Sequence, residues 1–224
     1  MALAVKPASA LFQKDVRSEL RTRYTLNALL MFVVISISVV LFSVAGETLQ
    51  PEITIGMLWI VMFFSAMSGM SRTFVAEEEK GTTMTLQLLA SPSSIYAGKL
   101  LFNLLLIVCL NAVIVVLFLL TMEKFAISQP GLFWLVILLG GFGIASATTI
   151  IAAIIAKART KGTLFPVLSF PILLPLIMAG ISATKTAVMG TTWEAAIPDL
   201  QLLVSYIVVV ITTSFLLFDY VWKD

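Results

Sequence analysis

The residues of this sequence that could take part in chemistry are few, and apart from one cysteine they lie outside its apolar segments. Three consecutive glutamates at 77–79 precede Gly81 and Thr82 in a polar stretch between two apolar segments. The chain has no histidine and a single cysteine, Cys109. Histidine is the commonest general base and metal ligand near neutral pH, so its absence removes most catalytic, metal-binding and haem-ligating arrangements. We therefore expect no enzyme activity, no cofactor bound by this chain, and a mechanical role for the polar stretch.

The sequence also lacks the motifs by which a membrane protein powers transport by itself. It contains no G-x-x-x-x-G-K-[ST] nucleotide-binding loop and no C-x-x-C-H haem-attachment motif. No Asp, Glu, Lys or Arg lies at the centre of an apolar segment, where such residues usually mark the pathways of proton- or ion-coupled carriers. If the chain moves a substrate, we expect the driving force to come from a partner.

The elements that must position the polar residues are apolar helices. Hydrophobic residues make up 60% of the chain and its mean hydropathy is +1.07, which leaves too little polar surface for a water-soluble domain. Apolar segments of about 20 residues match the thickness of a bilayer core. We predict a single all-α integral membrane domain over residues 1–224 with six transmembrane helices. The spans are expected at about 25–45, 53–71, 98–121, 132–156, 163–182 and 198–218.

The lysines and arginines predict how this domain is oriented. Of the 14 cations, all but Lys124 and Lys185 fall on one side of the alternating topology. Short loops rich in Lys and Arg stay on the cytoplasmic side, so both termini are expected inside. The two longer connections are a cytoplasmic loop at 72–97 and an outer loop at 183–197. The last span ends in three aromatic residues expected at the inner interface, Phe218, Tyr220 and Trp222.

Residues 8–23, which precede the first span, are amphipathic rather than apolar. Apolar residues from Leu11 to Leu20 recur on one arc of a helix, whereas Arg17 and Arg21 lie elsewhere on it. This pattern is typical of a helix that lies in the cytoplasmic membrane interface. The alternative is a plain basic flank of the first span.

The loop at 72–97 has a helical pattern of its own. Its three glutamates face three directions of a helix, so they cannot all be buried. Gly81 fits the end of one short helix, and Thr82 or Thr83 is suited to cap the next through its side-chain oxygen. Leucines then form an apolar stripe up to Ser91-Pro92, where the second helix is expected to stop. The alternative is a solvated charged loop.

Few polar or helix-breaking residues lie within the spans. Asn103 and Asn111 in the third span suit hydrogen bonds to other helices, or alternatively line a substrate path. The fifth span contains Pro166, Pro171 and Pro175, each of which removes a backbone hydrogen bond. We predict a kink there, either static or able to change when a partner moves.

Two stretches of the sequence are similar to one known family. The run Phe74-x-x-Glu77-x-x-x-Gly81-Thr82 is followed by leucines, Ser91-Pro92, and Gly98-Lys99 at the start of the next span. A second stretch, Lys157-x-Arg159-x-x-Gly162, precedes the prolines of the fifth span. Together with the number of spans and the amphipathic N-terminal segment, these resemble the haem exporter protein B family, CcmB, along nearly the whole chain.

This resemblance implies the fold and the site of a permease subunit of the ABC-2 type. In such permeases the loop between spans two and three is a coupling helix that rests in a groove of a cytoplasmic ATPase. The resemblance therefore assigns the ATPase contact to four residues, Glu77, Glu78, Gly81 and Thr82. It assigns Arg17 and Arg21 to an interface helix beside that loop.

The resemblance also implies a function and a set of partners. The chain would couple ATP hydrolysis by a partner to haem delivery, or to release of haem from its chaperone, in c-type cytochrome biogenesis. The expected partners are a CcmA-like ATPase, a second copy of the chain, a CcmC-like haem-handling membrane protein and a haem chaperone, with no nucleic acid. ATP would be bound by the partner, haem would be the substrate handled, and the location would be the bacterial cytoplasmic membrane. Two alternatives are an ABC-2 type permease for a lipid, glycan or drug, and a membrane scaffold that transports nothing.

Overall fold

The computed structural model describes residues 2–44, 49–79, 81–122, 125–156 and 161–223. Within these ranges the chain is helical and has no strands, as the sequence predicts. The helices are α1 (Ala2–Thr22), α2 (Tyr24–Val44), α3 (Pro51–Met70), α4 (Val75–Glu79), α5 (Thr83–Leu89), α6 (Pro92–Thr121), α7 (Pro130–Ala156), α8 (Lys161–Met189) and α9 (Trp193–Lys223). Lys124, Lys157 and Arg159 lie outside the described residues.

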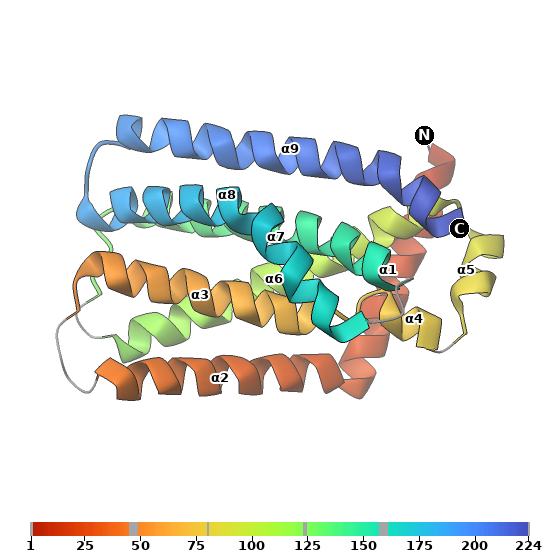
Figure 1. Cartoon of the computed structure of the whole chain (residues 1–224), viewed down its shortest axis with the longest axis horizontal. Helices are drawn as coiled ribbons and strands as arrows, with labels where there is room; N and C mark the ends of the chain where they lie inside the picture. Colours follow the sequence, from red (N-terminus) through yellow and green to blue (C-terminus); the bar gives the residue numbers. More distant parts are fainter. Residues whose placement is uncertain (1, 45–48, 80, 123–124, 157–160, 224) are drawn as a thin grey trace.

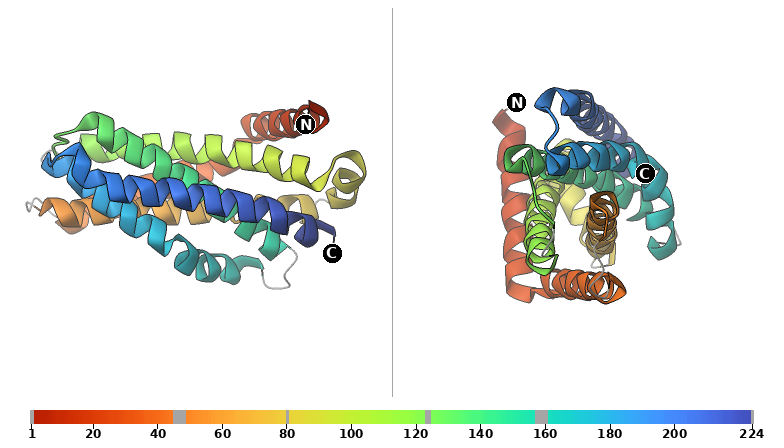
Figure 2. Two further views of the ribbon diagram at one scale, coloured as in Figure 1. Left: turned by 90° about the horizontal axis from the view of Figure 1, so that it is seen from above. Right: turned by 90° about the vertical axis from the view of Figure 1, so that its left-hand side faces the viewer.

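Six of these helices are long and apolar enough to cross a membrane, which confirms the predicted number of spans: α2, α3, α6, α7, α8 and α9. They run side by side along the long axis of the molecule, whereas α1 lies across the end of this bundle (Figures 1 and 2). Both termini lie at that end, together with α4 and α5 (Figure 1). An even number of crossings requires both ends of the chain on one side. Which side faces the cytoplasm stays a prediction from the Lys and Arg distribution.

The helices extend beyond the predicted spans. The third span begins at Pro92 rather than near residue 98, because Ser91 is extended (φ −65°, ψ 148°) and Pro92 occupies the first helical position, where its missing N–H costs nothing. The expected outer loop at 183–197 is wrong, because α8 continues to Met189 and α9 starts at Trp193. Hydropathy identifies the apolar part of a helix, but it does not identify the less apolar turns by which the helix continues beyond that part.

The centre of the bundle is built around Trp59 of α3. Its ring is fully buried and lies against Gly140 of α7 and Gly180 of α8. A Cβ atom at Gly140 or Gly180 would come within 2.4 Å or 2.2 Å of that ring, so both positions require glycine. The indole N–H donates to Thr184 Oγ1 at 3.0 Å, which satisfies the polar atom of the buried ring. The three helices α3, α7 and α8 are therefore locked together by one side chain.

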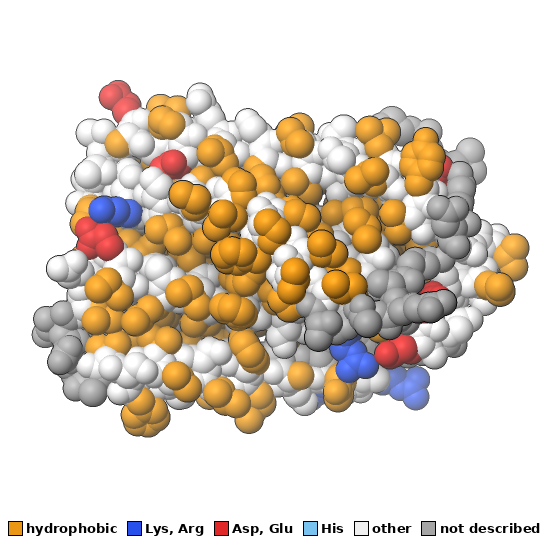
Figure 3. Space-filling model, in the orientation of Figure 1, with side chains coloured by type: hydrophobic (Ala, Val, Ile, Leu, Met, Phe, Trp, Pro, Cys, Tyr) orange, Lys and Arg blue, Asp and Glu red, His pale blue; other side chains and the backbone are white. Residues whose placement is uncertain are grey.

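The spans differ greatly in how much of them the chain itself covers. In α7, 78% of the residues in its most apolar stretch are buried, compared with 17% in α2 and 11% in α9. The outer faces of the other helices carry large apolar side chains over much of the molecule (Figure 3). A surface of this kind suits lipid tails rather than water. The chain is therefore a multi-pass membrane protein in which α7 is the central helix.

The fifth span bends, as its prolines predict. Pro166, Pro171 and Pro175 lie inside α8, which remains one helix yet turns away from the bundle over its proline-bearing half (Figures 1 and 2). Within this part, the hydroxyl of Tyr206 on α9 donates to the carbonyl of Ile172 at 2.9 Å. Backbone carbonyls in a membrane need such partners. Whether the bend acts as a hinge is untested.

Candidate functional site

The polar segment between α3 and α6 folds back against the end of the bundle. It is anchored by Phe74, whose side chain is buried and whose carbonyl accepts the N–H groups of Glu77 and Glu78 at 3.1 and 3.2 Å. The short helix α4 that follows points Glu77 inward, where it is only 6% exposed, and leaves Glu78 and Glu79 on the surface. The expectation that three consecutive glutamates cannot all be buried is confirmed.

Four charged side chains from three helices meet around Glu77, and we call this group the charged junction: Lys14 and Asp15 of α1, Glu77 of α4 and Lys99 of α6. Lys99 Nζ lies 2.9 Å from Glu77 Oε1 and 2.9 Å from Asp15 Oδ2. Lys14 Nζ lies 2.7 Å from Glu77 Oε1. Lys99 is only 4% exposed, so its ammonium group depends on these two carboxylates. The junction therefore joins α1, α4 and α6 into one unit.

The ionisation of Glu77 is set by two opposing effects. Burial acts to raise the pKa of this carboxyl, because the charged form loses hydration. The charge of Lys99 and the hydrogen bonds from Lys14, Thr82 and Lys99 act the other way and lower the pKa to about 2. The lowered pKa keeps Glu77 ionised near neutral pH.

Thr82 serves the junction instead of capping α5. It occupies the N-cap position of α5 but forms no side-chain cap hydrogen bond, and the hydroxyl of Thr83 donates to Glu78 Oε2 at 2.8 Å, so the predicted cap by Thr82 or Thr83 is wrong. Its hydroxyl donates to Glu77 Oε2 at 2.5 Å, because Gly81 turns the chain back with a φ of +65°. A left-handed φ is easy for glycine and strained for other residues. Gly81 and Thr82 therefore close the loop over the Glu77 carboxylate.

The helix α1 is held on α6 at a position next to Lys99. A Cβ atom at Gly98 would lie 2.8 Å from the Cβ of Leu11 and 2.9 Å from the carbonyl oxygen of Ala8. Glycine at 98 therefore allows the two helices to approach closely enough for Asp15 to reach Lys99. Leu11 is buried here, whereas Leu20, expected on the same apolar arc, is exposed. One part of the apolar arc therefore packs against the chain itself, and another part is exposed.

Arg17 and Arg21 lie outside the charged junction. Both are exposed on α1. Their exposure leaves them able to contact phosphate groups or a protein partner, and the predicted interface role is untested.

The helix α5 presents a large apolar surface to the outside, which we call the α5 tip. It consists of three side chains that are 78%, 88% and 75% exposed, Met84, Leu88 and Leu89. Leu86 points the other way into the core. Figure 3 shows apolar side chains at the extreme end of the molecule, where Figure 1 labels α5. Leu89, which the sequence places on the same apolar stripe as Leu86, is therefore exposed instead of buried beside it.

The C-terminal end of α9 holds α5 in place. The side-chain amide of Gln87 donates to the carbonyl of Trp222 at 2.7 Å. Trp222 and Phe218 stack with ring centroids 5.3 Å apart, and both pack against Phe74. These two rings are buried within the chain, whereas Tyr220 is exposed, and the expected place of the three residues at the inner interface stays a prediction. The aromatic rings support the loop that carries Glu77.

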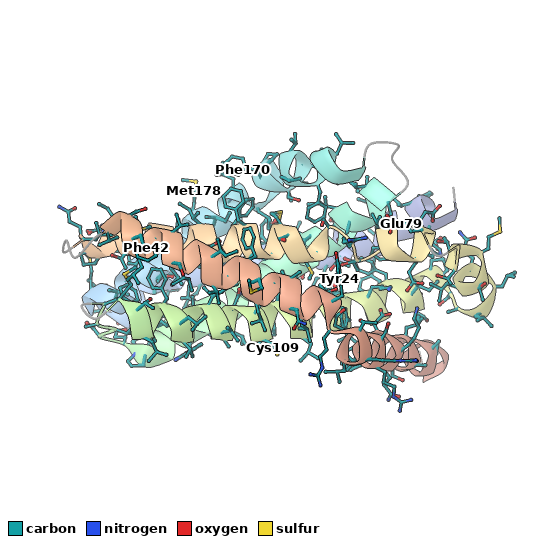
Figure 4. All side chains as sticks on the ribbon, turned by 90° about the horizontal axis from the view of Figure 1, so that it is seen from below. Tyr24, Phe42, Glu79, Cys109, Phe170 and Met178 are labelled. Atoms are coloured by element: carbon teal, nitrogen blue, oxygen red, sulfur yellow. The ribbon has the colours of Figure 1, made fainter. Side chains whose placement is uncertain are left out.

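A cavity of about 460 Å³ lies beside the charged junction. Its polar wall includes Lys14, Glu77 and Lys99, and its apolar wall includes Phe102. Arg72 lies over the ring of Tyr24, 5.9 Å from its centre, at the same opening. Figure 4 shows Tyr24 and Glu79 at the end of the bundle that carries α1. Across the described residues, no group of three His, Cys, Asp or Glu side chains is placed to hold a metal ion.

The two asparagines of α6 have different surroundings. Asn103 is buried, donates to Thr149 Oγ1 at 2.8 Å and accepts from Thr73 Oγ1 at 3.3 Å, so it joins α6 to α7 and to the start of the polar loop. Asn111 is also buried, but no hydrogen-bond partner is found for its amide among the described residues. Its nitrogen lies against Gly141 of α7. Asn103 therefore makes the contacts to neighbouring helices that the packing alternative requires. The alternative that the two asparagines line a substrate path stays untested.

Sequence reasoning found only Glu77 among the four residues of the charged junction. Lys14, Asp15 and Lys99 were not predicted as site residues, although Glu77 and Thr82 were. In the chain, Lys99 lies 22 residues and Lys14 lies 63 residues away from Glu77. One signal was visible, because Lys99 follows Gly98 at the start of a span and a lysine entering an apolar helix needs a counter-charge.

The model of the family described as CcmB protein matches residues 6–218. No curated protein matches the chain. The family match covers most of α1 and of α9, the five other spans, and the polar loop with its charged junction. The chain therefore belongs to the CcmB family, the membrane component of haem export for cytochrome c maturation.

Proposed function

We propose that this chain is the membrane subunit of an ABC-type complex, in which a cytoplasmic CcmA-like ATPase binds the α5 tip. Movement of α5 is passed through the charged junction to α6 and α1. This movement drives haem delivery, or release of haem from its chaperone, during c-type cytochrome biogenesis. The membership in the CcmB family supports the process, and the geometry of α4 and α5 supports the coupling role.

The observation that carries this proposal is the exposure of the α5 tip. Met84, Leu88 and Leu89 lie on a seven-residue helix outside the spans and have more than 70% of their surface uncovered. Large apolar side chains clustered on a surface mark a protein interaction site. The same helix is fastened to α9 by Gln87 and to the junction by Thr82. A force applied to the tip therefore reaches the spans.

The residues assigned to the ATPase contact divide into two groups by their burial. Glu78 and Gly81 are exposed and are available to a partner. Glu77 and Thr82 hold each other and the junction, so we assign them to transmission rather than to contact. Arg17 and Arg21 on α1 would face the phosphates of the cytoplasmic leaflet or the ATPase. The prolines of α8 would act as the hinge that responds.

The remaining parts of the proposal concern the partners that would supply what this chain lacks for transport by itself. ATP would be bound by the ATPase partner, and a second copy of the chain would complete the transport unit in the bacterial cytoplasmic membrane. Haem would be handled together with a CcmC-like membrane protein and a haem chaperone. With no histidine in the chain, haem iron would receive its imidazole ligands from those partners.

The proposal is tested by placing charge on the α5 tip. Leu88→Asp/Leu89→Asp is compared with Tyr220→Asp, which alters an apolar side chain exposed to 75% at the same end of the molecule. Membranes of the native host are solubilised, the tagged chain is purified, and the ATPase and holocytochrome c are quantified. We expect ATPase recovery to fall at least about tenfold in the double variant only, because interface hot spots contribute about 2 kcal/mol or more. Equal recovery from both variants would exclude the tip as the ATPase contact.

A second variant separates contact from transmission. Glu77→Gln removes the charge of a side chain that no partner touches, so ATPase recovery should stay at the wild-type level while holocytochrome c falls. Glu78→Gln, on the exposed neighbour, serves as the matched control. If Glu77→Gln loses the ATPase while the chain remains folded, Glu77 belongs to the contact surface instead. If holocytochrome c is normal in Glu77→Gln, the junction does not transmit.

A further inference from the structure

The cavity beside the charged junction has a polar end and an apolar end. Along α6 its wall runs from Lys99 through Phe102 to Leu106, a length of about 10 Å at a rise of about 1.5 Å per residue. Lys99 belongs to the charged junction, whereas Phe102 and Leu106 lie about one and two turns further into the apolar span. A molecule that fills this cavity of about 460 Å³ must therefore be polar at one end and apolar at the other.

The mouth of this cavity lies at the level where the spans begin. It is lined by Ser18 and Thr22 of α1 and by Tyr24, the first residue of α2, and all three are exposed. An exposed aromatic side chain at the end of a span is typical of the boundary between hydrocarbon and headgroups. Tyr24 and Glu79 lie at the same end of the bundle (Figure 4). The mouth is therefore at the depth of lipid headgroups, and the apolar end of the cavity reaches the depth of lipid chains.

The charges at the mouth keep hydrogen-bonding capacity that the chain does not use. The charged junction satisfies itself, because its two ammonium groups lie between its two carboxylates. Arg72 and Glu79, at the mouth, are both exposed and approach each other only to 3.5 Å, longer than the roughly 2.7–2.9 Å of a charge-assisted hydrogen bond. Besides the ring of Tyr24, the guanidinium group of Arg72 contacts only this carboxylate among the described residues, although it carries several N–H donors. Glu19 adds a second carboxylate, one oxygen of which accepts the N–H of Leu26 at 2.9 Å.

The charge and the shape of the cavity select one class of ligand. Beyond the charged junction, the lining presents one cation, Arg72, and two carboxylates, Glu19 and Glu79. A headgroup that combines a phosphate with a primary ammonium group complements both signs, whereas a purely anionic headgroup meets a surplus of carboxylates. In phosphoethanolamine a short two-carbon link joins the two groups, so they can reach neighbouring side chains such as Arg72 and Glu79.

We propose that this cavity binds one phospholipid with an ethanolamine headgroup. Its phosphate accepts hydrogen bonds from Arg72, its ammonium group donates to Glu79, and the first segments of its chains lie against Phe102 and Leu106. The volume of about 460 Å³ is within the range of about 300–1,000 Å³ for small-molecule sites, so it takes the headgroup and the start of the chains, and the bilayer takes the rest. The bound lipid would join the start of α2 to Arg72 and Glu79, which flank α4 (Val75–Glu79).

Two other ligands match the cavity less well. Haem carries two carboxylates, which would meet the surplus of carboxylates at the mouth, and the chain has no histidine for its iron. A soluble phosphate compound would leave the apolar end of the cavity without an apolar contact. The inference does not rest on the proposed function, because it uses only the cavity and its place at the end of the spans.

The test measures which lipid the purified chain binds. The full chain is delipidated in mild detergent and titrated with phosphatidylethanolamine, phosphatidylcholine or phosphatidylglycerol of identical chains, and bound lipid is counted by native mass spectrometry. We expect phosphatidylethanolamine to bind at least about fivefold more tightly than the other two, which corresponds to about 1 kcal/mol. Phosphatidylcholine lacks the N–H donors for Glu79, and phosphatidylglycerol lacks the cation. Glycerophosphoethanolamine, which has the headgroup without the chains, should not compete at the same concentration.

Two variants tie the lipid preference to the mouth of the cavity. Glu79→Lys should reverse the preference from phosphatidylethanolamine to phosphatidylglycerol, a result that misfolding cannot produce. Arg72→Gln should weaken the binding of both lipids at least about fivefold. The matched controls are Glu52→Lys and Lys185→Gln, which alter the exposed ion pair at the opposite end of the bundle. They should leave the order and the affinity of the lipids unchanged.

Any of three results would overturn the proposal. Equal affinity for the three lipids would show that the chain holds only unselected lipid around its spans. A change with Glu52→Lys as large as that with Glu79→Lys would assign the preference to surface charge instead of the cavity. Displacement of the lipid by glycerophosphoethanolamine or by haem would assign the cavity to a soluble ligand or to haem.

Discussion

The two ends of the helix bundle are held together by different forces. At the end that carries the termini, the charged junction buries Glu77 and Lys99 between three helices. At the opposite end, Lys185 of α8 pairs with Glu52 of α3 at 3.2 Å, with 47% and 40% of these side chains exposed. A buried ion pair depends on each partner, because a lone charge cannot be hydrated there. An exposed pair contributes little, because water replaces either partner.

The opposite end relies on its backbone instead. The N–H of Gln129 donates to the carbonyl of Ala187 at 2.9 Å, and the hydroxyl of Ser128 donates to the carbonyl of Val188 at 2.7 Å. These bonds fasten the start of α7 to the end of α8 with little dependence on side-chain charge. The end with α1, α4 and α5, in contrast, concentrates its stability in a few charged atoms. Such an arrangement responds as a unit when one helix moves.

The largest expected effect comes from removing one charge at each end. Glu77→Ala leaves Lys99 with a single carboxylate partner, so we expect a loss of about 3 kcal/mol in the free energy of unfolding, the lower end of the range for a broken buried pair. Glu52→Ala should cause no measurable loss. Unfolding of the purified proteins in mixed micelles of increasing sodium dodecyl sulfate, followed by tryptophan fluorescence, measures both.

A double variant shows whether the loss arises from the orphaned charge. Glu77→Ala/Lys99→Met, made in an Asp15→Leu background so that no buried carboxylate loses its partner, replaces these charges with apolar atoms, and such a replacement is often neutral or stabilising. We therefore expect it to be more stable than Glu77→Ala alone. A Glu52→Ala loss as large as that of Glu77→Ala would show that the two ends do not differ.

The next effect concerns the close contact of α1 with α6. Gly98→Ala would place a Cβ against the backbone of Ala8, and forcing an atom into a packed contact costs about 1–3 kcal/mol. We expect α1 to detach, so that trypsin cleaves at Arg17 and Arg21 much faster than in the wild type. Gly56→Ala in α3 is the control, because its Cβ would meet nothing within 4 Å. Unchanged cleavage in Gly98→Ala would show that the junction does not need the close approach.

The helical framework was predictable because each span can be identified from its own residues. Twenty apolar residues in a row identify a membrane helix whatever the rest of the chain does, and Gly81 marked the break between α4 and α5. The span limits were less certain, since the turns of α6 and α8 that leave the membrane carry Tyr96, Lys99 and Lys185. Their polarity resembles that of a loop, although Pro92 is itself a signal for a helix start.

The charged junction was not predictable as a whole because it is made across the chain. Periodicity shows that Glu77 and Glu78 face different ways, but not which of them is buried. That choice depends on Lys99 and Asp15, which α6 and α1 bring to the same place. The same reason explains Trp222, which the sequence places at an interface and the fold buries against Phe74. Contacts between distant segments require the packing of the helices to be known.

A smaller effect is expected at the two glycines with left-handed backbone, one at each end of the helix bundle. Gly81 has a φ of +65° and Gly190 a φ of +73°. Alanine at either position costs about 1–2 kcal/mol in backbone strain, and at Gly190 its Cβ would also lie 3.0 Å from the Cβ of Ser128. We expect Gly190→Ala to be the less stable variant and Gly81→Ala to be the one that lowers holocytochrome c. A fall in holocytochrome c with Gly190→Ala alone would contradict the division between the two ends.

The last effect is expected from acid, and it isolates the charge of Glu77. The pKa of this carboxyl is about 2 in the fold, below its ordinary value of 4.5, so its contribution to stability is complete above pH 4.5 and declines as the pH falls towards 2. The difference in unfolding temperature between wild type and Glu77→Gln should be constant from pH 7 to pH 5 and shrink below about pH 4.5. Taking the difference cancels carboxylates that titrate alike in both proteins. A difference that persists unchanged at pH 3, in micelles where both proteins remain helical, would mean that the shape of the side chain, and not its charge, joins α4 to α6.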